Sequence, residues 1–134
     1  GYDRAFKWHP ETGMVDLGAL GGISSEARAI NEKGEVVGTA KTTQGYNHAF
    51  IWHPDTGMFD LGTLGGRGSS ANSINNAGQV VGRTDYDDGV VSGVRAYLKK
   101  PGEDMESLGT LGGWWSEAIA INDAGQVSSY SATA

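Results

Sequence analysis

A six-residue motif, Leu-Gly-x-Leu-Gly-Gly, occurs three times in this chain of 134 residues and constrains its fold more than any other feature. The copies lie at Leu17–Gly22, Leu61–Gly66 and Leu108–Gly113, spaced by 44 and then 47 residues. Repetition at such a period indicates one supersecondary unit used several times. The chain is therefore expected to be a single repeat domain, or a fragment of one. Its three segments cover approximately 4–47, 48–94 and 95–134.

Each segment contains four short runs of residues that favour β-strands. In the second segment these runs are 48–52, 58–61, 70–75 and 79–82. Their Phe, Trp, Ile and Val residues suit a half-buried pleated surface. No stretch of ten residues keeps the 3.6-residue apolar spacing of an amphipathic helix. The sequence therefore predicts an all-β fold without a substantial helix.

Tight turns separate the predicted strands. The pattern Asn-x-x-Gly joins the third run to the fourth at 31–34, 75–78 and 122–125. It is typical of a type I hairpin turn that ends in a left-handed glycine. The Leu-Gly-x-Leu-Gly-Gly motif also lies between two strands, whereas a phosphate-binding glycine loop is followed by a helix amino terminus. We interpret its leucines as core anchors and its glycines as the point where the chain passes between sheets.

Composition argues against several classes of function. The formal net charge is −6, and acidic and basic residues are interspersed, so the chain lacks the basic footprint of a nucleic-acid-binding protein. It has no apolar run of about 18 residues, so no membrane span is predicted. It has no cysteine, which excludes disulfides and thiolate chemistry and is compatible with either the cytosol or a bacterial exterior.

Four strands in 44–47 residues match the size of a β-propeller blade. The inner strand of each blade is expected at 27–31, 71–75 and 118–122, where small side chains suit a crowded centre. Three blades are too few to close a propeller. With the inner strands placed in this way, the chain contains half a blade, two whole blades and another half blade. A head-to-tail dimer would then contain six blades. A β-trefoil and an open repeat stack are the alternatives.

The chain resembles the HAF-repeat family, a group of extracellular repeats of bacterial proteins. The resemblance rests on His48-Ala-Phe-Ile-Trp52, on Met58-Phe-Asp-Leu-Gly-Thr-Leu-Gly-Gly66 and on the recurring Ala-x-x-Ile-Asn-x-x-Gly-Gln-Val-Val-Gly pattern, and it spans nearly the whole chain. The third segment departs from the pattern at Lys99 and at Val127-Ser-Ser129. The resemblance implies an extracellular or cell-surface location and carries no assigned biochemical activity.

Trp114 and Trp115 are the candidate ligand-binding residues. They follow the third Gly-Gly pair, where the other segments have Ile23-Ser24 and Arg67-Gly68. Adjacent tryptophans in a loop suit an exposed platform for a sugar or a protein partner. The alternative is that they pack between blades or in a subunit interface. Of the two, Trp115 is expected to protrude, because the other segments have short residues at its position.

Asp85, Asp87 and Asp88 are the best candidates for a metal site. They stand close to Gly89, but the full spacing of a calcium loop and its distal glutamate are missing, so an acidic surface loop is the favoured interpretation. No Gly-x-Ser-x-Gly elbow or Ser-His-Asp set is evident. We therefore predict no catalytic residues and no cofactor.

The expected function is that of a non-enzymatic, extracellular binding or assembly module. Its partners are expected to be other copies of itself, in a homo-oligomer or filament, and a glycan or protein ligand. The alternative is a structural, self-associating unit of a surface layer or extracellular fibre. An enzyme fragment is the least favoured interpretation.

Overall fold

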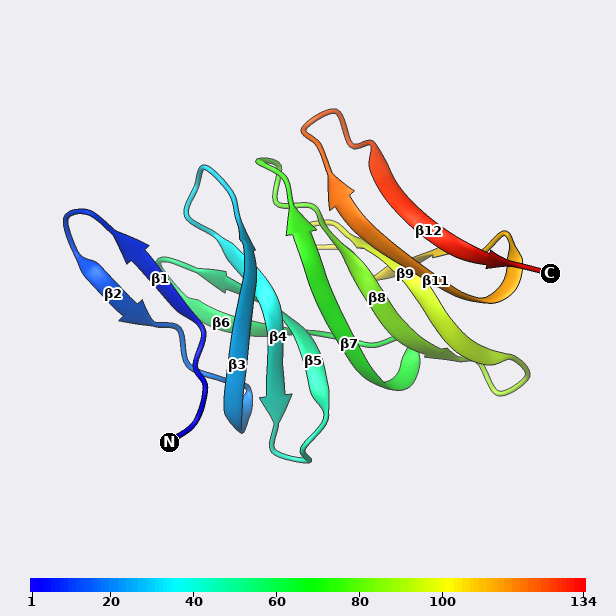
Figure 1. Cartoon of the computed structure of the whole chain (residues 1–134), viewed down its shortest axis with the longest axis horizontal. Coiled ribbons are helices and arrows are strands. Elements are labelled where there is room, and N and C mark those ends of the chain that lie inside the picture. Colours follow the sequence, from blue (N-terminus) through cyan, green and yellow to red (C-terminus); the bar gives the residue numbers. More distant parts are fainter.

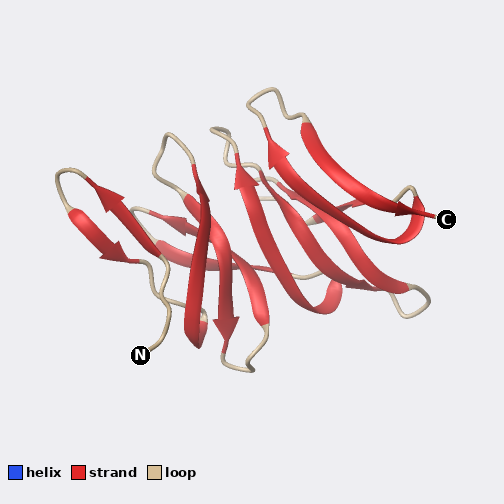
Figure 2. Cartoon of the chain, in the orientation of Figure 1, coloured by secondary structure: helices blue, strands red, loops and turns tan.

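The computed structural model describes residues 1–134 and contains twelve β-strands and no helix (Figure 2). The all-β prediction is therefore confirmed. The strands are β1 (Phe6–His9), β2 (Gly13–Asp16), β3 (Gly21–Ile30), β4 (Val36–Thr42), β5 (Asn47–His53), β6 (Gly57–Gly62), β7 (Gly65–Ile74), β8 (Val80–Asp87), β9 (Ser92–Lys99), β10 (Glu106–Gly109), β11 (Gly112–Ile121) and β12 (Val127–Thr133).

The strands pair mainly with their neighbours in the chain. β1 and β2 form an antiparallel hairpin, β3–β4–β5–β6 form a four-stranded antiparallel sheet, and β7–β8–β9–β10 repeat that order. β11 and β12 form a last antiparallel pair, and one parallel bridge, Trp115 to Val94, connects β11 to β9. The sheets follow one another from the N-terminus to the C-terminus, and the single chain forms no closed barrel or propeller (Figure 1).

The hairpin turns have the predicted geometry. Gly34, Gly78 and Gly125 have φ angles of 78°, 79° and 82°, and the N–H of each donates to the carbonyl of the asparagine three residues earlier. Glycine adopts such a left-handed conformation without the steric cost that a Cβ would bring. The substituted end of the third segment also forms a regular strand, β12.

The Leu-Gly-x-Leu-Gly-Gly motif joins two strands, and most of it is itself extended. In the second segment β6 continues to Gly62 and β7 already begins at Gly65, whose φ of +96° turns the chain. Gly66 lies within β7, and a Cβ on it would come 2.3 Å from the Cβ of Asp85 on β8. The two glycines therefore have different roles, since one turns the backbone and the other allows β7 and β8 to approach.

A buried serine connects each sheet to the next at the same place in each segment. Ser25, Ser69 and Ser116 each donate to the carbonyl of the glycine seven residues earlier, at 2.5–2.6 Å. The same hydroxyls accept the backbone N–H groups of Ala5, Ala49 and Ala96, at 2.8–2.9 Å. In the second and third segments this one side chain ties the incoming strand to two strands of the preceding sheet, and in the first segment it ties β3 to Ala5 and Gly18, which flank the β1–β2 hairpin.

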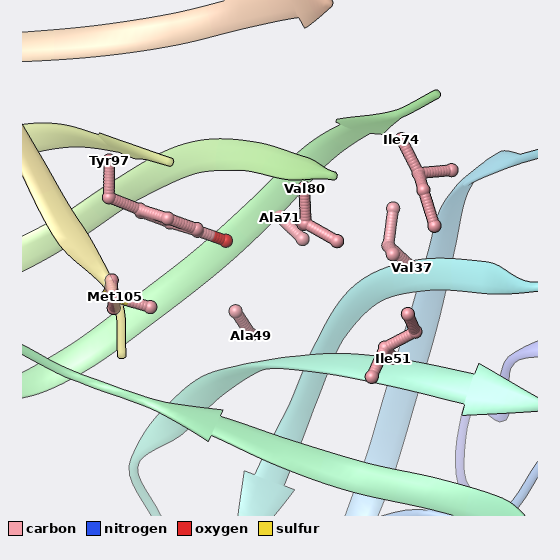
Figure 3. Close-up of a cluster of buried hydrophobic side chains, with 8 residues drawn as sticks. All are labelled: Val37, Ala49, Ile51, Ala71, Ile74, Val80, Tyr97 and Met105. Atoms are coloured by element: carbon pink, nitrogen blue, oxygen red, sulfur yellow. The ribbon is translucent and has the colours of Figure 1, made fainter. Parts of the chain in front are cut away.

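The main hydrophobic core lies between the two four-stranded sheets (Figure 3). Its eight buried residues are Val37, Ala49, Ile51, Ala71, Ile74, Val80, Tyr97 and Met105. The Tyr97 hydroxyl donates to the Ser70 carbonyl at 3.0 Å, and burial raises the pKa of this phenol well above its usual range. Tyr97 therefore stays neutral and serves as a packed, hydrogen-bonded core residue.

Gly66→Val is expected to destabilise the fold by on the order of 1–3 kcal/mol, because the added side chain overpacks the contact between β7 and β8. Gly68→Val is the comparison variant and should destabilise less, since the nearest atom to its Cβ would be the Asn47 carbonyl oxygen at 3.2 Å, against 2.3 Å to the nearest atom at Gly66. Urea unfolding midpoints measure the difference. Equal midpoints for the two variants would refute the close-approach role of Gly66.

Candidate assembly surfaces and binding residues

A ladder of asparagine side chains crosses the molecule at the hairpin turns. The side-chain amide of Asn31 donates to the carbonyl of Asn75, and that of Asn75 donates to the carbonyl of Asn122, both at 3.0 Å. Each side chain also accepts a backbone N–H within its own turn, four residues further along the chain. The residues that shape the turns therefore also join one sheet to the next.

A second line of hydrogen bonds runs beside the asparagine ladder. The N–H of Glu32 donates to the side-chain oxygen of Asn76, and the N–H of Asn76 donates to Asp123, both at 2.8 Å. The backbone N–H and the side-chain amide of Asn76 both donate to the Asp123 carboxylate, and these two bonds lower its pKa from the usual value. Both lines have one direction, since each turn donates to the turn that follows it in the chain.

The two lines stop at the ends of the chain, where each terminal turn keeps its internal hydrogen bonds but lacks the bond to a neighbouring turn. At one end the Asn122 side-chain amide donates only to Gln126 within its own turn, so one of its N–H bonds has no acceptor, and neither has the Asp123 N–H. At the other end the Asn31 carbonyl accepts only the N–H of Gly34 in its own turn, and the Glu32 carboxylate accepts no hydrogen bond. The donors at one end therefore complement the acceptors at the other.

At the N-terminal end, which carries Asn31, apolar residues are exposed where their counterparts inside the molecule are buried. Ile30 is 56% exposed, whereas Ile74 is 7% exposed. Phe6 is 48% exposed, whereas Phe50 is completely buried. The interior positions are covered by the neighbouring sheet, and the end positions have no such cover. At the far end Leu111, in the glycine motif, is likewise exposed.

The strand edges of β1 and β12 are unpaired where the matching edges inside the molecule are paired. β1 pairs only with β2, and β12 pairs only with β11, whereas β4 and β5 at the same sequence positions pair with each other along six residues. An open strand edge presents unpaired N–H and C=O groups that readily accept another strand. The chain thus begins with two strands that match the last two of a four-stranded sheet, and it ends with two that match the first two.

The two tryptophans do not form a common platform. Trp114 is 68% exposed, as Ile23 and Arg67 at the same position are exposed. Trp115 is half-buried and lies against Tyr130, with ring centroids 4.9 Å apart. The expectation that Trp115 protrudes is therefore wrong. Successive side chains of a strand point to opposite faces, and here the protruding face is that of Trp114.

Trp115→Ala is expected to lower the free energy of unfolding by on the order of 1–3 kcal/mol, because it removes the packing on Tyr130. Trp114→Ala is the matched variant and should stay within about 0.5 kcal/mol of the parent. Unfolding midpoints and iodide quenching of fluorescence measure both effects. Equal destabilisation by the two substitutions would contradict the assignment of Trp115 to packing.

The three aspartates of the acidic loop point to separate partners. Asp85 accepts the N–H of Gly68, and Asp87 accepts the N–H of Gly89. Asp88 accepts the N–H groups of Val90 and Val91 and the Tyr86 hydroxyl. Nowhere in the chain do three or more His, Cys, Asp or Glu side chains gather as metal ligands. The aspartates therefore shape the β8–β9 hairpin and the start of β7.

The hydrogen bonds from Val91 and Val90 lower the pKa of Asp88 from its usual value. Because the folded pKa is lowered, the ordering of the loop is complete above the pKa of an unfolded aspartate and is lost as pH falls through the folded one. An NMR titration should therefore show Asp88 ionising below the usual range, with the Val90 and Val91 amide shifts following it. Ionisation of Asp88 at the usual pH would contradict this.

A polar groove of about 380 Å³ lies between the two four-stranded sheets, β3–β6 and β7–β10. Arg28, Thr39, Ser70 and Arg83 are among its twelve lining residues, of which only two are hydrophobic. None of these four stood out in the sequence patterns. The sequence feature that could have indicated the groove is Ser70, because the first and third segments both have glutamate at that position.

Comparison with known proteins adds no relative to these observations, since no family model, curated protein or solved structure matches the chain. The structure also has no helix of the length and apolar character that a membrane crossing requires.

Proposed function

We propose that this chain is a non-enzymatic, propeller-like assembly module whose two ends join head to tail with other copies of the chain. Its expected setting is extracellular or on a bacterial cell surface, in keeping with the HAF-repeat resemblance of its motifs. A closed dimer would contain six four-stranded blades, and an unclosed series would form a fibre. Both outcomes use the same junction between the two ends.

The complementarity of the two ends is the observation that carries this proposal. Ile30 and Phe6 are exposed at one end, although the same positions are buried inside the molecule. At the other end one amide N–H of Asn122 and the backbone N–H of Asp123 have no acceptor. A second copy would cover the apolar residues and continue both hydrogen-bonded lines. This one junction therefore satisfies the open edges, the apolar surface and the turn groups together.

The interior pairing also gives the register of the junction. Val37 pairs with Ile51 between β4 and β5, and Val81 pairs with Leu98 between β8 and β9. The residues at the same positions of the end strands are Ser128 on β12 and Lys7 on β1. In the proposed junction Ser128 of one copy therefore lies opposite Lys7 of the next.

Ile30→Asp tests the junction, because a carboxylate at a covered apolar position strongly disfavours association. Ile23→Asp is the matched control, since its position is exposed in all three segments. The parent and Ile23→Asp should self-associate at micromolar concentration in light scattering, and Ile30→Asp should dissociate at least about tenfold more readily. A monomeric parent, or equal association of both variants, would refute the proposal.

Cross-linking tests the register directly, because the chain contains no cysteine. A Lys7→Cys, Ser128→Cys double variant should form disulfide-linked oligomers under mild oxidation. The control is Lys7→Cys with Thr133→Cys, which lies near the other end of β12. Equal cross-linking of both double variants would contradict the proposed register.

A further inference from the structure

The groove between the two four-stranded sheets has a filled counterpart at the next junction, between the β7–β10 sheet and the β11–β12 pair. There the Glu117 carboxylate accepts the Asn72 side-chain amide at 3.0 Å and the Tyr130 hydroxyl at 2.9 Å. The guanidinium nitrogen Nε of Arg83 lies 3.8 Å from the same carboxylate. Trp115 packs beside it on the Tyr130 ring. A carboxylate thus occupies this junction as part of the chain itself.

The same positions at the first junction carry residues that leave this place open. Forty-seven residues before Glu117, Trp115 and Tyr130 stand Ser70, Gly68 and Arg83. Arginine thus replaces the tyrosine, glycine replaces the tryptophan, and the short hydroxyl of serine replaces the carboxylate. The groove of about 380 Å³ lies where those groups would be.

Arginine and hydroxyl side chains line the open place, together with one carboxylate, that of Asp85, which accepts the N–H of Gly68. Arg28 stands at the position of Asn72, and one of its outer nitrogens, Nη1, donates to the Asn72 side-chain oxygen at 2.9 Å, while its Nε donates to Glu26. No side-chain hydrogen bond engages Arg83 within the chain, and its nearest carboxylate is 3.8 Å away.

Two hydroxyl groups at the groove are also unsatisfied. The side-chain oxygens of Ser70 and Thr39 are buried and have no hydrogen-bond partner, although both residues line the groove. Ser70 as a whole is only 6% exposed. Buried polar atoms almost always have a partner, so these two hydroxyls mark a place where a polar group is missing.

We propose that this groove binds the carboxylate of an acidic sugar residue, a uronate, in the place that Glu117 fills at the next junction. Arg83 and Arg28 meet the carboxylate from two sides, because guanidinium groups match carboxylate geometry and form strong charge-assisted hydrogen bonds. The buried hydroxyls of Ser70 and Thr39 lie beside this place and lack hydrogen-bond partners of their own. This ligand site goes beyond the assembly function and is independent of it, since all its residues lie inside one chain.

The lining of the groove favours a sugar over an acidic peptide. Only two of its twelve lining residues are hydrophobic, so it offers little surface for apolar parts of a peptide. Tyr46 at the groove edge is 38% exposed, and the Arg67 guanidinium lies over its ring, 5.7 Å from the centroid. A sugar combines hydroxyl groups with one carboxylate in a small volume, which is the combination that these residues complement.

Calorimetric titration with trigalacturonate tests the site, with neutral galactotriose and a hexaglutamate peptide as the comparison ligands. Trigalacturonate should bind, and its affinity should fall as salt rises, because the attraction is ionic. Arg83→Gln should weaken binding at least about tenfold. Ser70→Glu should abolish it, because the new side chain fills the groove as Glu117 fills its own junction.

Two control variants make the same charge changes elsewhere. Lys33→Gln removes a positive charge at an exposed turn, and Thr12→Glu adds a negative charge at another; both should bind like the parent. Circular dichroism checks that each variant is folded. If Ser70→Glu does not fold, the binding of trigalacturonate by Arg83→Gln tests the proposal.

Three results would overturn the proposal. They are no binding of trigalacturonate to the parent, equal binding of galactotriose, and unchanged binding by folded Arg83→Gln or Ser70→Glu. Tighter binding of hexaglutamate than of trigalacturonate would overturn the assignment to a sugar.

Discussion

The hydrogen bonds of one buried serine hold consecutive sheets together, and the rest of the structure depends on them. Ser69 on β7 donates to Gly62 at the end of β6 and accepts from Ala49 on β5. It thereby sets where the incoming strand crosses the preceding sheet. Because the hydroxyl is buried, a residue without it would leave a backbone N–H unpaired, which costs more than the bond itself contributes. The core residues and the asparagine ladder meet only when this crossing is correct.

Strands and turns could be predicted because their determinants are local. The four residues from Asn75 to Gly78 are sufficient to specify their turn, and the β-favouring run 48–52 lies within the observed β5. The bond from Asn31 to Asn75 could not be predicted in this way, because it spans 44 residues and depends on how the sheets stack. Whether the three segments close into a propeller with a second copy stays a prediction.

The candidate site was harder to predict than the fold because it is defined by a missing side chain. Trp114 and Trp115 attracted notice by their size, yet Trp115 is packed on Tyr130. Ser70 is inconspicuous in the sequence, and its meaning depends on Glu117 standing at the same place one sheet later. Comparing segments for what one of them lacks would have found the groove. Recognising the groove as a binding site also requires knowing that Arg28 and Arg83 line it from the two sheets, which the sequence alone does not show.

The acidic loop has a consequence for how such a chain changes length. The second segment is three residues longer than the first, and the extra residues lie around 85–94. The pairing of β8 with β9 nevertheless repeats that of β4 with β5, since Gly82 faces Tyr97 as Gly38 faces Phe50. Growth at this hairpin tip leaves the serine and asparagine contacts in place. The tip is therefore a permissive position, where evolution or a protein engineer can graft a new peptide onto an unchanged scaffold.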